Sequence, residues 1–348
     1  MKAGKLSVLL VADTHLGLDL PLRPRVKRRR RGYDFLRNFE QALEPALHGQ
    51  VDMVVHGGDL LDRPRVSEQL LETAVRPLPR VAKSGIPVFL VPGNHERRRI
   101  PLRLWTVDPN LHVFREPGTF VHSAGDVRVA MSGFPSPRDI RRSFRELVRA
   151  TAHDSVRAHV HLLCVHAAIE GAQVGVHDFT FRHGPDVVAG RDVPSDFAAV
   201  LAGHIHRRQT LTRDLRGRAL AAPVIYPGSV ERTSFAERDE DKGYVIADFI
   251  PTEDGRGELV GWRFHELSSR PMVCFDLQVD TMRPEQLSAL LRERLAALNP
   301  HAVVRIRVVG DMSPEVQRLL SAPGMRCVAP RTMNVGVAYP SVAPRARR

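Results

Sequence analysis

Apolar runs of strand length recur along the first 206 residues, and each ends in a short polar motif. The run at 51–55 leads through His56, Gly57 and Gly58 to Asp59. Such a run is typical of a buried strand, and the glycines allow a sharp turn at its end. Four other runs end in the same way, at residues 6–12, 86–92, 159–165 and 197–202. The pattern predicts an α/β sheet whose strands each present polar side chains from their carboxyl ends.

The polar motifs contain the residue types that bind metal ions. They read Asp-Thr-His at 13–15, Gly-Gly-Asp at 57–59, Gly-Asn-His-Glu at 93–96, His166, and Gly-His-Ile-His at 203–206. Sites in open α/β sheets form at the carboxyl ends of the strands, so we expect these side chains to converge. The candidate metal ligands are Asp13, His15, Asp59, Asn94, His166, His204 and His206.

Seven ligands are more than one ion with an open coordination position needs. Two ions about 3.5–4 Å apart, bridged by one carboxylate, would use them all. Two carboxylates against two divalent ions leave a net positive site, which suits a bridging hydroxide and an anionic phosphate ester. Four imidazoles favour manganese, iron or zinc over magnesium, with manganese the expected metal.

His95 follows the candidate ligand Asn94 and cannot easily point in the same direction. We therefore assign it a catalytic role, either orienting the phosphate or protonating the leaving oxygen. The alternative is a hydrogen-bonded histidine in a turn.

The remaining periodicity predicts two domains. The first domain is the catalytic domain, which we place in residues 1–268. Its further elements are predicted by helical spacing at 33–44, 67–81 and 137–150 and by strand patterns at 127–132, 243–249 and 259–267. The connection 167–194 is long enough to be a functional loop or lid. Residues 272–348 predict a small α+β module, with a strand at 272–279, a helix at 284–297, a strand at 302–309 and a disordered basic tail.

The charge of the chain points to a polyanionic partner. The net charge is +12 and the pI is about 10.5, although only five of the 51 basic residues are lysine, and such an arginine bias can also come from genome composition. Basic runs follow two of the motifs, and we interpret them as contacts to nucleic-acid phosphates rather than as a merely solvated surface. These residues are Arg23, Arg25, Lys27, Arg28, Arg29, Arg30, Arg31, Arg97, Arg98 and Arg99.

The cysteines and the apolar runs indicate a cytoplasmic protein. Cys164, Cys274 and Cys327 are far apart and lack ligand spacing, so we interpret them as buried thiols in a reducing compartment. No apolar run approaches 18 residues, and no cleavage site follows the short N-terminal run. The sequence therefore predicts neither a membrane span nor a signal peptide.

The five motifs, in this order, resemble those of the calcineurin-like metallophosphoesterase superfamily. Three stretches resemble more narrowly those of the SbcD-type DNA repair nucleases. They are Asp13-Thr-His-Leu-Gly followed by an arginine-rich loop, Gly58-Asp-Leu-Leu-Asp, and YPGSVERTSFAERDEDKGY at 226–244. Position 62 is Asp where part of the family has a second histidine. An auxiliary role of that histidine is therefore not carried over to this chain.

The resemblance implies a four-layer sandwich of two mixed sheets flanked by helices, with a C-terminal capping domain. It implies that one metal is bound by Asp13, His15, Asp59 and His206, the second by Asp59, Asn94, His166 and His204, and that His95 is the catalytic histidine. It also implies DNA as substrate, a homodimer, and an ATPase partner of the SbcC type.

The sequence thus predicts a dinuclear metal-dependent phosphodiesterase that cleaves DNA, by an exonuclease mode, a single-strand endonuclease mode or both. One alternative is a phosphodiesterase or phosphatase for small nucleotides. Another is a DNA-binding protein with an inactive site, although the complete ligand set argues against it.

Overall fold

A computed structural model describes residues 4–21, 28–96 and 108–339. Its internal contacts divide the chain into two compact units, one of residues 1–22 with 31–268 and one of residues 23–30 with 269–348. The boundary after Ser268 lies at the residue where the sequence places the end of the catalytic domain. The grouping of residues 23–30 with the second unit has no counterpart in the sequence pattern.

The first sheet of the larger unit contains the strands that precede three of the motifs. Its order is β16-β15-β1-β2-β3-β4, with β1 to β4 parallel and with β15 antiparallel to both β1 and β16. The strands are β1 (Leu6–Val11), β2 (Met53–His56), β3 (Val88–Leu90), β4 (Leu111–Val113), β15 (Gly243–Ile250) and β16 (Glu258–Glu266).

The second sheet contains the strands that precede the other two motifs. Its order is β13-β14-β12-β7-β6-β5, in which β6, β7, β12 and β14 are parallel and the edge strands β5 and β13 are antiparallel. The strands are β5 (Gly118–Ala124), β6 (Val127–Gly133), β7 (Val160–His166), β12 (Ala199–Gly203), β13 (Gln209–Arg213) and β14 (Ala219–Tyr226).

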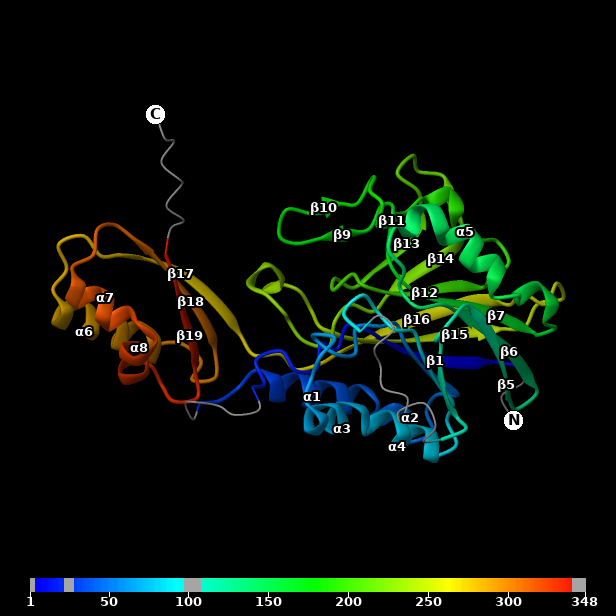
Figure 1. Cartoon of the computed structure of the whole chain (residues 1–348), viewed down its shortest axis with the longest axis horizontal. Coiled ribbons are helices and arrows are strands. Elements are labelled where there is room, and N and C mark those ends of the chain that lie inside the picture. The colour runs from blue at the N-terminus through cyan, green and yellow to red at the C-terminus, as the bar shows by residue number, and fades with distance from the viewer. Residues whose placement is uncertain (1–3, 22–27, 97–107, 340–348) are drawn as a thin grey trace. The chain divides into compact units, whose positions relative to one another are not determined.

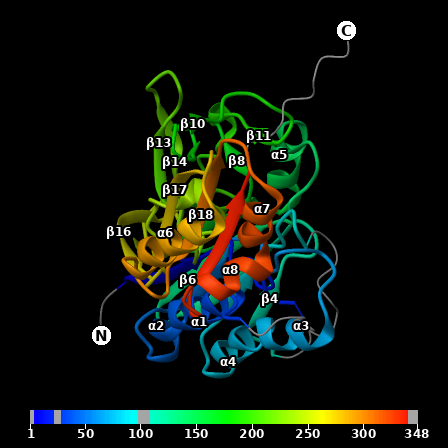
Figure 2. The ribbon, with the colours of Figure 1, turned by 90° about the vertical axis from the view of Figure 1, so that its left-hand side faces the viewer.

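Alternating side chains along each strand build a separate core on either side of each sheet. In β1, Leu9 and Val11 face the helices, whereas Val8 and Leu10 join the core that includes Leu162 of β7 in the other sheet. The first sheet is covered by α1 (Gly32–Ala42), α2 (Glu44–Leu47), α3 (Glu68–Val75) and α4 (Pro77–Lys83), and the second by α5 (Ile140–Ala150). Both views place α1 to α4 and α5 on opposite sides of the two sheets (Figures 1 and 2). The predicted sandwich of two mixed sheets flanked by helices is confirmed.

Prolines interrupt two of the segments with helical spacing. The segment at 67–81, in which the sequence predicts a break at Pro77 and Pro79, forms α3 and α4, because Pro77 occupies the first turn of α4, where its missing N–H is harmless. Pro45 likewise lies at the start of α2, after α1 has ended at Ala42. Both breaks follow from the ring of proline, which cannot continue a helix that is already formed.

The long connection after His166 folds back over the second sheet. It contains the parallel pair β8 (Ala168–Ile169) and β11 (Val187–Val188), the antiparallel pair β9 (Gln173–Val174) and β10 (Phe179–Thr180), and the 3₁₀ turn Gly190–Asp192. The buried Tyr226 hydroxyl donates to the Ala167 carbonyl (2.9 Å) and accepts from the Ile169 amide (3.0 Å). This hydroxyl therefore fixes the start of the connection, directly after His166.

The second unit is a three-stranded parallel sheet with three helices packed on it (Figure 1). Strands β17 (Met272–Gln278) and β18 (Val303–Val309) and helix α6 (Pro284–Ala296) correspond to the predicted elements. Helices α7 (Pro314–Leu320) and α8 (Ala322–Val328) and strand β19 (Asn334–Ala338) were not predicted.

The expectation of three buried thiols is correct only for Cys164, which lies in the core between the two sheets. Cys274 is half-buried and Cys327 is exposed. In α8 it is Met325 and Val328 that face the core, so the intervening Cys327 points outward. Among the described residues, no helix is both long enough and apolar enough to cross a membrane.

Replacing Tyr226 with phenylalanine should loosen the segment after His166. The Ile169 N–H and the Ala167 carbonyl would lose their buried partner, at a cost of about 1–3 kcal/mol. Hydrogen exchange should accelerate at residues 167–171 and the melting temperature should fall. Tyr33→Phe, at a side chain that is 63% exposed, is the matched control. Equal protection of residues 167–171 in both variants would contradict the assigned role of the hydroxyl.

Candidate metal centre

The strand ends bring all seven candidate ligands and His95 into one cluster. Asp13 and His15 follow β1, Asp59 follows β2, and Asn94 and His95 follow β3 of the first sheet; His166 ends β7, and His204 and His206 follow β12 of the second sheet. Three groups with metal-ligand geometry result. The first consists of Asp13, His15 and His206, the second of Asp59, His166 and His204, and a third of His15, Asp62 and His95 at the edge of the cluster.

Asp59 lies between the first two groups. Its Oδ2 is 3.3 Å from His166 Nε2 and 3.9 Å from His15 Nε2, and its Oδ1 accepts a hydrogen bond from the His95 backbone N–H (2.9 Å). Asn94 Oδ1 is 2.9 Å from His166 Nε2 and 3.0 Å from His204 Nδ1, which adds the amide to the second group. A single carboxylate therefore faces both sets of donors.

The first group is equally compact. His15 Nε2 lies 3.0 Å from His206 Nε2, and His206 Nε2 lies 4.0 Å from Asp13 Oδ1. The Asp13 carboxylate is also held by the His204 backbone N–H, at 3.1 Å and 3.0 Å from its two oxygens. This bond ties the loop after β1 to the loop after β12, so the donors come from both sheets.

The backbone at these strand ends is strained. Asp13, His15, Asp59 and His204 have φ values of 51°, 41°, 51° and 90°, which side chains with a Cβ rarely adopt. Gly93 shows how tightly the loops pack, since a Cβ there would lie 2.1 Å from Asp59 Oδ1. Strain of this kind is typical of functional sites, where the surrounding structure imposes the geometry.

Burial and neighbouring charges set the pKa values in the cluster. Burial, together with nearby imidazoles, lowers the pKa of His15 and that of His204 to about 3, so these two rings are neutral at neutral pH. Burial alone would lower the pKa of His166, but the charge of Asp59 outweighs it and raises this pKa to about 9. Burial also raises the pKa of Asp13 to about 6. Asp13 and Asp59 beside the neutral rings of His15 and His204 form a donor set that fits divalent cations, and a cation bound there would displace the proton of His166.

Hydrogen bonds orient two of the rings in this cluster, those of His166 and His206. His166 Nδ1 contacts the Gly57 carbonyl (2.8 Å), so Nδ1 carries the proton and Nε2 faces the cluster. His206 Nδ1 contacts Glu237 Oε1 (3.2 Å), with the same consequence for its Nε2. His15 Nδ1 is buried without a hydrogen-bond partner in the described part of the chain, and its nearest carboxylate oxygen, in Asp62, is 3.9 Å away.

Glu237 and Lys242 are site residues that the sequence reasoning did not identify. The Lys242 side chain is completely buried, and its Nζ contacts Glu237 Oε2 (2.8 Å), Glu240 Oε2 (2.8 Å) and the His206 carbonyl (2.9 Å). Burial favours the neutral acid at Glu237, but His206 and Lys242 together hold its pKa well below the usual value. Both residues lie in the 226–244 stretch, which the sequence analysis used only as a mark of resemblance.

His95 lies at the opening of the cluster. Its Nδ1 contacts the Asp62 carbonyl, its Nε2 is 3.8 Å from Asp59 Oδ2, and 36% of its side chain is exposed. Its ring meets that of His15 edge-on with centroids 4.8 Å apart. Asp62 thus contributes its backbone oxygen at the position where part of the family carries a histidine.

The predicted basic contacts are divided between several places. Arg23, Arg25, Lys27, Arg97, Arg98 and Arg99 lie outside the described residues. Arg29 belongs to the second unit, where its Nη1 contacts His301 Nδ1 (2.7 Å) and its carbonyl accepts from Asn334 Nδ2 (3.1 Å); Arg28 and Arg30 group with it. The half-buried Arg31 guanidinium donates to the Arg232 carbonyl, which favours a structural role.

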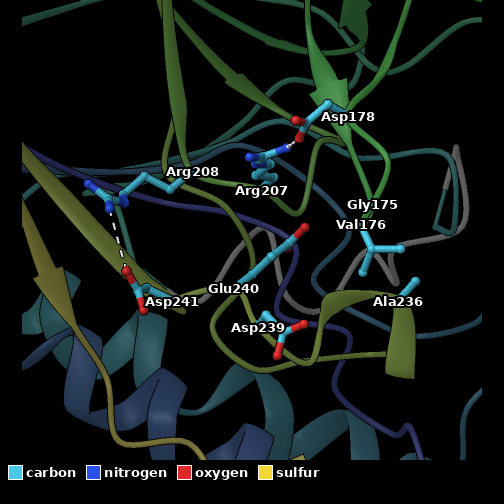
Figure 3. A pocket seen from close by; sticks show the side chains of 9 residues that line it. All are labelled: Gly175, Val176, Asp178, Arg207, Arg208, Ala236, Asp239, Glu240 and Asp241. Carbon is cyan, nitrogen blue, oxygen red and sulfur yellow. Dashed lines mark hydrogen bonds and ion pairs between the residues drawn. The ribbon is translucent and has the colours of Figure 1, made fainter.

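A cavity of about 410 Å³ is lined in part by Arg207, the residue that follows His206 in the chain (Figure 3). Arg207 points to Asp178 of the β9–β10 loop and Arg208 to Asp241, with the latter contact 3.5 Å long. Asp239 and Glu240 complete a largely acidic wall. Both arginines therefore already have carboxylate partners.

Comparison with known proteins agrees with this geometry. A family model described as calcineurin-like phosphoesterase matches residues 6–208, which include every candidate ligand. The chain is 27% identical to a DNA double-strand break repair protein Mre11 of Methanopyrus kandleri, over 91% of this chain and 68% of the relative. It is 32% identical to the protein of the same name from Haloferax volcanii, over 87% of this chain and 61% of that relative.

A bacterial relative is also similar. The chain is 28% identical to the SbcD component of the nuclease SbcCD of Bacillus subtilis strain 168, over 76% of this chain and 71% of the relative. Among the Mre11 relatives, the chain spans 61% of the Haloferax protein and 51% of one from Methanosarcina mazei.

Replacing Glu237 with glutamine should weaken metal binding without removing a ligand. The carboxylate that orients His206 would be lost, and changes to such supporting groups typically cost about 10–100-fold in metal affinity. Calorimetric titration with manganese would measure the loss, with Glu258→Gln on the exposed face of β16 as the control. Equal manganese affinity in the two variants would show that Glu237 does not support the site.

Proposed function

Because this chain belongs to the calcineurin-like phosphoesterase family, we propose that it is a dinuclear metal-dependent phosphodiesterase that cleaves DNA. The observation that carries the proposal is Asp59, whose Oδ2 faces both a His15/His206 pair and a His166/His204/Asn94 set. One carboxylate shared by two donor sets is the arrangement that two adjacent ions need.

The residues present fit such ions. One would be held by Asp13, His15, Asp59 and His206, and the other by Asp59, Asn94, His166 and His204. Bound there, the ions supply Lewis-acid activation of the phosphate ester and of the attacking water. Manganese is the proposed metal, with iron or zinc as the alternatives, because four imidazoles disfavour magnesium.

The chain's own contribution to the chemistry centres on His95. Since its Nδ1 is engaged by the Asp62 carbonyl, Nε2 is the atom that faces the site. A protonated Nε2 there can bind a phosphate oxygen and donate its proton to the leaving oxygen. Partial exposure of His95 leaves this atom reachable by a substrate that enters from solvent.

Two features support DNA as the substrate. The relatives named above are a DNA double-strand break repair protein and a nuclease component, and this chain carries a net charge of +12. A broadly basic surface helps an enzyme that follows a phosphate backbone. The resemblance also supports two further proposals, a homodimer and an ATPase partner of the SbcC type.

The cavity lined in part by Arg207 favours a second candidate, a phosphodiesterase for small nucleotides. Its volume of about 410 Å³ falls within the range of small-ligand sites. Its acidic wall, however, would repel an anionic nucleotide. DNA is therefore the better-supported substrate.

A substrate comparison tests the proposal. With manganese, a labelled oligonucleotide should be cleaved faster than cyclic or linear mononucleotides at equal phosphate concentration. Asp59→Asn should abolish all of these activities in a folded protein, because the charge shared by both donor sets is lost. Mononucleotide hydrolysis ten times faster than DNA cleavage would establish the small-nucleotide function instead.

His95→Ala should separate binding from chemistry. The variant should retain both metal ions and bind DNA, while its cleavage rate falls by roughly 10²–10⁴. Metal analysis and single-turnover cleavage would be measured on the same preparation. Loss of one ion from this variant would identify His95 as a ligand and overturn its assigned role.

A further inference from the structure

A cationic pocket lies on the outer side of the second sheet, in the larger unit. It has a volume of about 360 Å³ and is lined by Arg141, Arg191, Arg216, Arg218 and His183 together with two carboxylates. Its walls come from the first turn of α5, the 3₁₀ turn at 190–192, the turn between β13 and β14, and the long connection after His166. We call it the arginine pocket.

Both carboxylates of the arginine pocket already accept hydrogen bonds from neighbouring residues of the chain. Glu170 Oε2 accepts from the Gly190 amide (3.1 Å), and its Oε1 is 3.8 Å from His183 Nδ1. Asp214 Oδ1 accepts from the backbone amides of Arg216 (2.8 Å) and Arg218 (3.0 Å), and its Oδ2 accepts from Arg218 Nε (2.8 Å). Four guanidinium groups against two carboxylates leave two net positive charges.

Two of the arginines are fixed in place and two are available. Arg141 donates to the Val187 carbonyl (3.1 Å), and Arg218 is held by Asp214. Arg216 has no acidic partner within the described residues. Arg191 is 73% exposed and 3.9 Å from Asp192, whose carboxylate is already bound by Arg145 Nε at 2.7 Å. A rigid cationic floor with two free guanidinium groups at its edge is suited to an incoming anion.

The arginine pocket lies at the end of β13 that is farther along the chain from His206. This strand starts at Gln209, three residues after His206, and ends at Arg213, next to the turn that carries Arg216 and Arg218. Four residue steps at about 3.3 Å give roughly 13 Å for the strand alone. The pocket is therefore separate from the metal centre.

We propose that the arginine pocket binds a backbone phosphate of DNA other than the phosphate that is cleaved. The inference rests on the proposed function and locates a contact away from the metal centre. Guanidinium groups match phosphate oxygens in two-point hydrogen bonds, and all of the lining residues except Leu215 have charged or imidazole side chains, which suits an anionic ligand. Exposed Arg142 and Arg149 on α5 continue the positive surface beside the pocket.

The double variant Arg191→Gln/Arg216→Gln tests the proposal, since neither side chain holds the fold. Binding of a labelled duplex to the whole chain, measured by anisotropy over a range of salt concentrations, should weaken about tenfold at low salt. The log–log salt slope should fall by about 0.9 for each lost phosphate contact. Hydrolysis of a small aryl phosphodiester should be unchanged, because the metal centre is intact.

Arg76→Gln/Arg80→Gln is the matched control, because it removes the same charge from the end of α3 and from the exposed part of α4, over the other sheet. An equal loss of DNA affinity in this control, or an unaltered salt slope in the pocket variant, would overturn the proposal. Titration with inorganic phosphate and with a mononucleotide forms a separate arm. If the pocket variant loses only their binding and keeps its DNA affinity, the pocket is a site for free anions and the proposal is wrong.

If the proposed DNA-cleaving function itself is wrong, the same measurements give a different result from the one expected when only the pocket assignment is wrong. In that case the unmodified chain would hydrolyse the small diester but would neither bind nor cleave DNA, and the proposal for the arginine pocket would fail with it. If only the pocket assignment is wrong, the unmodified chain and the pocket variant would bind and cleave DNA equally well.

Discussion

The contact between Gly57 and Gly203 is the constraint on which the metal centre depends, because it joins the ends of two separate sheets. A Cβ on Gly203 would lie 2.2 Å from the Gly57 carbonyl oxygen, so the backbones meet where any larger residue would separate them. Five of the eight clustered residues belong to one sheet and three to the other. The strained backbone at Asp13 and Asp59 is tolerated because both sheets hold it in place.

Hydrogen bonds from residues around the candidate ligands fix the orientation and the charge of the imidazole rings. The Gly57 carbonyl and the Glu237 carboxylate each fix one imidazole, and buried Lys242 in turn neutralises Glu237. A buried charge without such a partner would be costly, so the three groups stabilise one another. The 226–244 stretch is therefore part of the centre, although it contributes no candidate ligand.

The sequence predicted the clustering of the candidate ligands and the layered sandwich because both follow from local periodicity. Apolar runs of strand length lead into polar residues at Asp59 and His166, and the carboxyl ends of parallel strands must meet at one edge. It did not predict β19 or the pairing of β8 with β11, because these short strands depend on distant partners. Glu237 was missed for a similar reason: its role depends on a contact with His206, 31 residues away in the chain.

The division of the ligands between two sheets also has a mechanical consequence. Cys164, Met131 and Val55 fill the interior between the sheets, and their volume sets how far apart the sheets stand. Residues that lie far from any donor atom thereby help to set the spacing between the candidate ligands of the two sheets. The packing of the hydrophobic interior and the geometry of the candidate site are therefore coupled.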